Sequence, residues 1–131
     1  NLSEIAQKSI KETTYHLRWC SEWIIRLGDG TELSHNKVQT AVNNLWTYTQ
    51  ELFKPIESEI EMTKQGICPD LQLIHTIWNE TIDRIFLEAT LIKPDSVWMQ
   101  KGGKSGVHSE HLGFILSDLQ FMQRAYPGLE W

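Results

Sequence analysis

The first part of the chain carries apolar and small residues at alternating steps of four and three positions. They are Ala6, Ile10, Thr13, Leu17, Cys20, Ile24 and Leu27. This spacing puts all of them on one face of a helix, so the pattern predicts a long amphipathic helix over 2–27. The glycines at 28 and 30 supply the backbone freedom that a turn needs, and we expect the helix to end near Gly28.

The same periodicity predicts three further helical segments. The second helix is expected from Ser34, as its N-cap, to before Pro55, and a third long helix from Pro69 to before Pro94. Between Pro55 and Pro69 a short Glu-rich helix is expected, which the cysteine before Pro69 should end. The inward stripes are expected to be Val38, Ala41, Val42, Leu45, Thr49 and Leu52 in the second helix, and Leu71, Ile74, Trp78, Ile82, Ile85, Phe86 and Ala89 in the third.

Helical spacing returns near the end of the chain. The segment 95–106 contains three glycines and predicts an exposed loop. The segment 108–125 then predicts a last helix, with its stripe at His108, Leu112, Ile115, Leu119 and Met122. Because the pattern contains no convincing pair of strands, we predict an all-α fold with about four long helices.

Composition narrows the class of protein. With 131 residues, 40% of them hydrophobic, the chain fits one globular domain, and its net charge of −5 argues against binding nucleic acid or an anionic membrane. Cys20 and Cys68 lie far apart and have no metal-ligand spacing, which favours two reduced thiols in a cytoplasmic protein. No apolar run approaches the ~20 residues of a membrane span. We take Asn1 as a cut end and expect the chain to be part of a longer protein.

The stretch KETTYH at 11–16 is one residue away from half of a metal site. A glutamate at position 13 would form a Glu-x-x-His pair with His16, the pair that di-iron proteins point into a helical bundle. The residue there is Thr13, which can make a hydrogen bond but brings no carboxylate to offset the metal charge or to bridge two metals. The residues therefore favour a buried, hydrogen-bonded histidine at 16 over a metal ligand.

Other histidine motifs are explained more simply. Glu32 and His35 form a complete Glu-x-x-His, but they lie in the turn before a helix, where Glu32 suits the helix dipole and Ser34 suits a cap. His108 and His111 have one-turn spacing suitable for zinc, but the segment has no third ligand at a matching position, which favours an interfacial or capping role.

Two further features bear on function. The sequence GKS at 103–105 ends like a phosphate-binding P-loop, but that motif needs a glycine at position 98, where Trp98 stands, and a preceding strand. We therefore reject a nucleotide hydrolase. Two of the six tryptophans, Trp98 and Trp131, fall in a loop and at the terminus, where aromatic residues often contact another chain.

Several separated segments resemble the C subunits of bacterial phenylacetyl-CoA 1,2-epoxidases. They are KETTYHLR at 11–18, RLGDGTE-x-SH at 26–35, LW-x-YT-x-ELF at 45–53, GVHSEHLG at 106–113 and QRAYPG at 123–128. The resemblance implies a ferritin-like helical bundle. It also implies a non-catalytic relative of the A subunit, whose di-iron centre inserts oxygen into the ring of phenylacetyl-CoA. Position 16 then falls on the ligand histidine of the A subunit and position 13 on its ligand glutamate, so Thr13 and His16 are relic ligand positions.

From this resemblance we expect 1–131 to be the C-terminal part of a single ferritin-like domain, in a structural subunit that takes part in aerobic phenylacetate catabolism. Its expected partners are the catalytic A subunit and other subunits of the complex. It is expected to carry no cofactor, to meet phenylacetyl-CoA only through the complex, to bind neither nucleic acid nor membrane, and to be cytoplasmic. The alternatives are a di-iron oxygenase in its own right and a free-standing helical interaction module.

The glycine-rich loop carries the only other candidate contacts. Lys101 and Lys104 lie among three glycines, where ammonium and backbone donors are exposed together. We predict that this loop contacts a partner subunit or the phosphates of coenzyme A bound there, since ammonium groups bind phosphate well. The alternative is a solvated connector.

Overall fold

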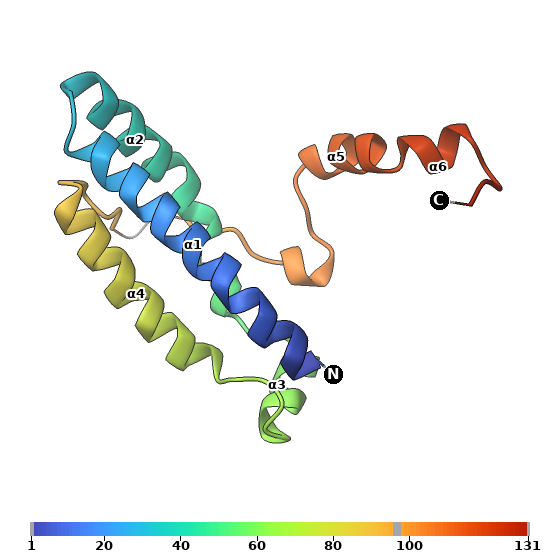
Figure 1. Ribbon diagram of the computed structural model, residues 1–131. Helices are drawn as coiled ribbons and strands as arrows, with labels where there is room; N and C mark the ends of the chain where they lie inside the picture. The colour runs from blue at the N-terminus through green and yellow to red at the C-terminus, as the bar shows by residue number, and fades with distance from the viewer. Residues whose placement is uncertain (1, 96–97, 131) are drawn as a thin grey trace. The chain divides into compact units, whose positions relative to one another are not determined.

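The computed structural model describes residues 2–95 and 98–130, and these ranges contain helices and turns but no strand (Figure 1). The chain divides into two compact units, 1–99 and 100–131. The all-α prediction is confirmed. None of the helices in the described ranges combines the length and apolar character that crossing a bilayer requires.

The first two helices form a hairpin. Helix α1 spans Leu2–Gly28 and α2 spans Glu32–Leu45, with contacts between them. The predicted end of the first helix is confirmed, but the predicted cap of the second is wrong. Thr31 is the N-cap, because its hydroxyl accepts a hydrogen bond from the backbone N–H of Ser34 at 3.2 Å, while the Ser34 hydroxyl accepts one from Thr31 N–H at 3.0 Å. Ser34 is thus the reciprocal partner in a capping box, three residues into the helix.

After α2 the chain tightens into two 3₁₀ turns, Trp46–Tyr48 and Gln50–Phe53. The predicted apolar stripe of the second helix is therefore wrong at its C-terminal end. Leu45 and Leu52 were expected inside and are exposed, whereas Trp46 and Phe53 are buried. A 3₁₀ turn has about three residues per turn instead of 3.6, so a stripe continued at α-helical spacing drifts off the buried face by Leu52. Leu45, the last residue of α2, is exposed before this change of spacing begins.

The two middle helices agree with the sequence. The short helix α3 spans Glu57–Lys64, and the long helix α4 spans Leu71–Glu88 with Asp70 as its N-cap. The Asp70 carboxylate accepts a hydrogen bond from the backbone N–H of Gln72 at 2.9 Å. The predicted stripe of α4 is confirmed in its second half, since Ile85 and Phe86 are buried and Trp78 and Ile82 are half-buried.

The core of the first unit is small and partly aromatic. Its buried cluster comprises Trp46, Ile85, Phe86, Ala89 and Leu91, with Ile24, Ile25, Val38, Val42, Trp78, Ile82 and Met99 packed against it. The ring centroid of Trp46 lies 5.6 Å from that of Trp78 and 5.9 Å from that of Phe86. These rings join the turn after α2 to α4, and aliphatic side chains of α1 and α2 pack against the cluster.

The non-helical segment that follows α4 is tied back onto the helices by side chains. Gln39 on α2 accepts a hydrogen bond from the Ile92 N–H at 2.8 Å and donates one to the Ile92 carbonyl at 2.9 Å. The Lys93 ammonium donates to the Asp83 carboxylate on α4 at 2.5 Å. Gln39 thus pairs two backbone groups of Ile92 that no helix satisfies.

The second unit contains a 3₁₀ turn, Gly103–Ser105, and two short helices, α5 His111–Leu119 and α6 Phe121–Ala125. The predicted single helix over 108–125 is wrong in two respects. It begins three residues later, and it is interrupted at Gln120, whose backbone (φ −98°, ψ 4°) departs from helical values. No residue in 100–130 is buried.

Candidate functional site

The relic ligand positions lie in the middle of α1. Both Thr13 and His16 are exposed, and 62% of the His16 side chain is accessible. The Glu12 carboxylate lies 3.9 Å from the imidazole Nε2, and the ring of Tyr15 stands edge-on to the imidazole at 6.1 Å. Within the described residues there is no group of three or more His, Cys, Asp or Glu side chains that could hold a metal.

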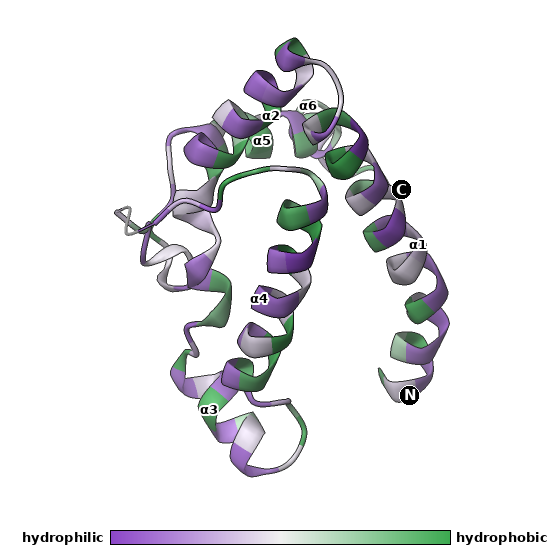
Figure 2. Ribbon diagram, turned by 90° about the vertical axis from the view of Figure 1, so that its left-hand side faces the viewer, coloured by the Kyte–Doolittle hydropathy of each residue, from purple (hydrophilic) through white to green (hydrophobic). Residues whose placement is uncertain are grey.

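The expectation that His16 is buried is wrong for this chain. Burial on α1 is confined to its last third, where Ser21, Ile24 and Ile25 are half-buried and Gly28 is buried. These residues are the part of α1 that lies against the ends of α2 and α4. The described helices do not cover the first two-thirds of α1, since residues 2–20 are all exposed. Figure 2 shows the N-terminal part of α1 running apart from α4.

The second histidine motif lies at the start of α2, as the sequence indicated, although Thr31 and not Ser34 is the cap. His35 lies in the first turn of α2, and its Nδ1 is 2.8 Å from the carbonyl oxygen of Gly28 at the end of α1. Since a carbonyl only accepts, Nδ1 carries the proton and donates. The Thr90 hydroxyl lies 3.3 Å from the same oxygen. Three chain segments therefore meet at one carbonyl, and Glu32 occupies the first turn of α2 as expected.

The motifs of the second unit are exposed. His108 lies in the loop before α5 and His111 is the first residue of that helix. The predicted exposure of Lys101 and Lys104 is confirmed, and the loop contains a closed turn that begins directly after Lys101. The Val107 N–H donates to the Gly102 carbonyl at 2.8 Å, and positive φ angles of 93° at Gly102 and 88° at Gly106 make this turn possible.

A hollow lined by α1, α2 and α4 was not anticipated. It has a volume of about 340 Å³, and its lining is Ile24, Val38, Ala41, Val42, Leu45, Trp46, Thr49, Trp78, Ile82 and Phe86. The only hydroxyl in this lining, on Thr49, already donates to the Trp46 carbonyl at 2.8 Å. The hollow can accept apolar side chains and offers no acid, base or metal ligand.

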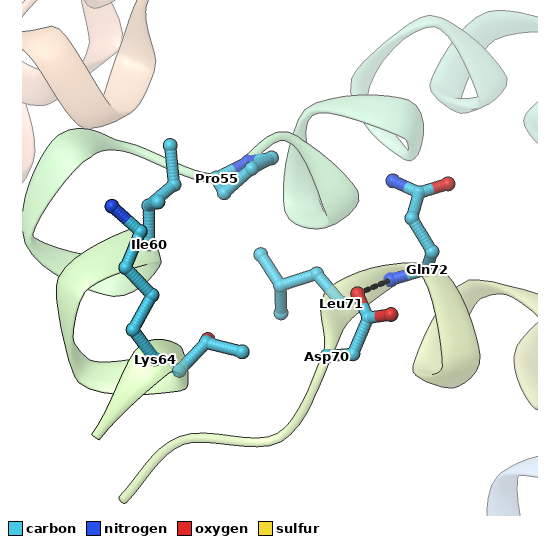
Figure 3. A pocket seen from close by; sticks show the side chains of 7 residues that line it. Pro55, Ile60, Lys64, Asp70, Leu71 and Gln72 are labelled. Atoms are coloured by element: carbon cyan, nitrogen blue, oxygen red, sulfur yellow. Dashed lines mark hydrogen bonds between the residues drawn. The ribbon is translucent and has the colours of Figure 1, made fainter. Parts of the chain in front are cut away.

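A smaller hollow of about 230 Å³ lies between α3 and the start of α4 (Figure 3). Pro55, Ile60 and Leu71 give it apolar walls, while Lys64 and Asp70 lie at its edge. One carboxylate oxygen of Asp70 is used to cap α4, as the dashed line in Figure 3 shows. These residues are best explained as the packing of the α3–α4 junction.

The two cysteines and the two tryptophans at 98 and 131 are the remaining residues that the sequence singled out. Cys20 is exposed and Cys68 is half-buried, and both are free thiols, as predicted. Trp98 is 73% exposed, which agrees with its expected place in a loop, and Trp131 lies outside the described residues. Exposed aromatic and apolar side chains, and not a cluster of reactive groups, are therefore the prominent surface feature of the described chain.

Comparison with known proteins gives the family. A family model described as "Phenylacetic acid catabolic protein" matches residues 1–131. The C subunit of the 1,2-phenylacetyl-CoA epoxidase of Escherichia coli (strain K12) is 42% identical over 130 residues, which cover 99% of this chain and 52% of that relative. The chain thus spans about half the length of the curated relative, and the resemblance to epoxidase C subunits is confirmed. The chain belongs to the phenylacetic acid catabolic protein family.

Proposed function

We propose that this chain belongs to a non-catalytic structural subunit of a multicomponent phenylacetyl-CoA epoxidase, and that the subunit pairs with the catalytic di-iron A subunit. The observation that carries the proposal is Thr13. It stands three residues before His16, at the position where the resemblance puts a ligand glutamate. The similarity to a protein named as the C subunit of such an epoxidase supports the same conclusion.

The chemistry of the position explains why a threonine disarms the site. A di-iron centre in a helical bundle takes one glutamate from each of two helices and a Glu-x-x-His pair from each of the other two. Replacing a glutamate by Thr13 removes a negative charge that offsets the metal charge and an oxygen pair that can bridge two irons. A histidine at 16 can then persist without a metal, for packing or hydrogen bonding.

The exposed apolar surface supports a chain that is completed by other helices. Large apolar residues on α1 are exposed along most of its length; they include Leu2, Ile5, Ile10, Leu17, Trp19 and Trp23. Helices that expose so much apolar area are expected to be covered by other protein. We therefore propose that the 131 residues are the C-terminal part of one ferritin-like domain, and that other helices of the full-length protein cover the relic positions Thr13 and His16.

The subunit's contacts within the complex and its location in the cell are also part of the proposal. Lys101 and Lys104 are proposed to contact the partner subunit or the phosphates of its coenzyme A substrate. The subunit is proposed to carry no cofactor of its own and to meet phenylacetyl-CoA only within the complex. Free cysteines favour a cytoplasmic protein.

The test is co-expression of the full-length protein with its A subunit, followed by size-exclusion chromatography and iron analysis of each separated subunit. We expect co-elution, with iron in the A subunit and only background iron in this one. About two irons per chain in this subunit would instead identify a di-iron oxygenase in its own right. Failure to co-elute, with a folded and iron-free protein, would identify a free-standing helical module.

A further inference from the structure

The hollow between α1, α2 and α4 is an unfilled part of the core. Trp46 and Phe86 belong to the buried cluster of the first unit and also line the hollow. Ile24, Val42 and Trp78 pack against the same cluster and line the hollow as well. Protein cores are normally packed without large voids, so an apolar hollow that borders buried side chains marks a place where the described chain supplies too few of them.

The size and the lining of the hollow define what can fill it. Its volume of about 340 Å³ is more than twice that of the ~150 Å³ apolar cavity that accommodates a benzene ring, so at least two large side chains fit. The Thr49 hydroxyl already donates to the Trp46 carbonyl, and none of the described residues that line the hollow has a charged or amide side chain. A charged group inserted there would lose its hydrogen bonds to water without replacement, so the occupant that fits is apolar.

The apolar surface continues from the hollow along α1. Ile24 lines the hollow, and Leu17 and Ile10 follow on the same face of α1, each about two helical turns before the last. Leu17 and Ile10 are 56% and 60% exposed. The three positions extend over about 21 Å of the helix axis, at about 1.5 Å per residue. An uncovered apolar strip of this length fits a second helix packed along it, whereas a small molecule in the hollow would leave most of the strip in water.

The continuity of the hollow with the core favours an occupant on the same polypeptide. A segment of the same chain is held near the hollow at high effective concentration from the moment of folding, whereas a separate subunit would leave the core incomplete until the two proteins met. In the C subunit of Escherichia coli, the matched 130 residues are 52% of the protein, so about 120 residues lie outside the match. A full-length protein of similar length has enough further residues to supply the helix.

We propose that a helix from the part of the full-length protein outside these 131 residues packs along α1 and inserts at least two large apolar side chains into the hollow. The helix is expected to be amphipathic, with side chains the size of leucine, isoleucine or phenylalanine repeating at steps of three and four on the face toward α1. This inference rests on the proposed function, in which the 131 residues are part of one ferritin-like domain, and it names the element that completes the core of that domain. The hollow is then closed to the A subunit.

Photo-crosslinking can identify the occupant in the full-length protein, purified without the A subunit. A diazirine amino acid is placed at position 45, because Leu45 lines the hollow and is 62% exposed in the described chain. We expect an intramolecular crosslink whose other end, located by peptide mass spectrometry, lies outside residues 1–131. Position 44 is the control, since Asn44 is exposed and does not line the hollow, and the same amino acid there should not give this crosslink.

A change of volume tests whether the hollow is filled. Ala41 lines the hollow, and Ala41→Leu adds an isopropyl group with little change in helix propensity. If a helix fills the hollow, the added group overpacks it, and the melting temperature of the full-length protein alone should fall by about 2–10 °C. Asn44→Leu puts the same side chain at an exposed position of α2 outside the hollow, and should change the melting temperature by less than about 2 °C.

The other outcomes overturn the inference. A crosslink from position 45 to a second copy, to another segment within 1–131, or only to added A subunit would assign the hollow to a different occupant. No crosslink, or an unchanged or raised melting temperature of Ala41→Leu, would show that the hollow stays open. Both readouts use this protein alone, so they are separate from the proposed function, which fails if the wild-type protein does not bind the A subunit, whatever fills the hollow.

Discussion

The imidazole Nδ1 of His35 donates a hydrogen bond to the carbonyl oxygen of Gly28 across 2.8 Å, which ties the start of α2 to the end of α1. The Thr90 hydroxyl approaches the same carbonyl at 3.3 Å from the segment after α4. Three helix ends can meet there because Gly28 has no side chain. A Cβ built on Gly28 would lie 2.9 Å from the Cβ of Ala89, the fully buried residue that follows α4.

Gly28→Ala is therefore expected to destabilise the full-length protein by about 1–3 kcal/mol, the usual cost of adding a methyl group to a filled site. The measurement is the free energy of unfolding in urea. Gly113→Ala on α5 is the matched control, because a Cβ there meets nothing within 4 Å. The control should be neutral or stabilising by up to about 1 kcal/mol, since alanine favours helix over glycine. Equal effects of the two substitutions would contradict this account.

The segment after α4 depends on one side chain for its position. Gln39 makes two hydrogen bonds to the backbone of Ile92, one to the N–H and one to the carbonyl. Gln39→Met keeps the length of the side chain but removes both bonds, so it should cost about 1–3 kcal/mol and leave two backbone groups without these partners.

Hydrogen exchange gives a local readout of the same change. In Gln39→Met the amide of Ile92 should exchange faster, because its acceptor is gone, while the amides of α1 should not change. Asn43→Ala is the control, since it removes only the 3.0 Å bond that Gln39 donates to the Asn43 side chain. Unchanged protection of Ile92 in Gln39→Met would show that the segment is held by other contacts.

The helix positions could be predicted because apolar spacing and helix-ending residues are local signals. The stripe of α1 and the glycine at 28 indicate its length, and the Pro69–Asp70 pair marks the start of α4. The cap at Thr31 could not be assigned because threonine and serine at 31 and 34 can each serve as a cap, and only their reciprocal hydrogen bonds distinguish the roles. The 3₁₀ turns after Leu45 escape prediction because the sequence there still shows α-helical spacing.

The surface was harder to predict than the helices, because burial depends on which other segments cover a face. The part of the α1 stripe beside His16 is apolar enough to be buried, yet the described chain leaves it exposed. In contrast, the place of Trp98 in a loop could be predicted, but the hydrogen bond that its carbonyl accepts could not. The Thr47 hydroxyl donates this bond between positions 51 residues apart, which no local pattern records.

Thr13→Glu tests the disarmed site directly in the full-length protein. The substitution restores a Glu-x-x-His pair with His16, but we expect iron at background level, because one half-site provides too few carboxylates for two metals. The measurement is iron per chain by mass spectrometry, with Thr13→Gln as the uncharged control of the same size. Stoichiometric iron in Thr13→Glu, or epoxidation by it without the A subunit, would argue for a nearly complete metal site.

The last prediction concerns the loop of the second unit. Lys104 is exposed within a turn that the bond from Val107 to Gly102 closes, and the exposed Lys101 directly precedes that turn. If they approach the phosphates of coenzyme A in the assembled complex, replacing both by glutamine should raise the apparent KM for phenylacetyl-CoA by about threefold to tenfold, with little change in the melting temperature. The effect should be largest at low ionic strength, where exposed charges are least screened.

Lys11→Gln with Lys37→Gln is the control, because it removes the same charge from exposed positions on α1 and α2. If both double variants change KM equally, the effect comes from net charge, and if neither changes KM or the affinity for the A subunit, the loop is only a connector.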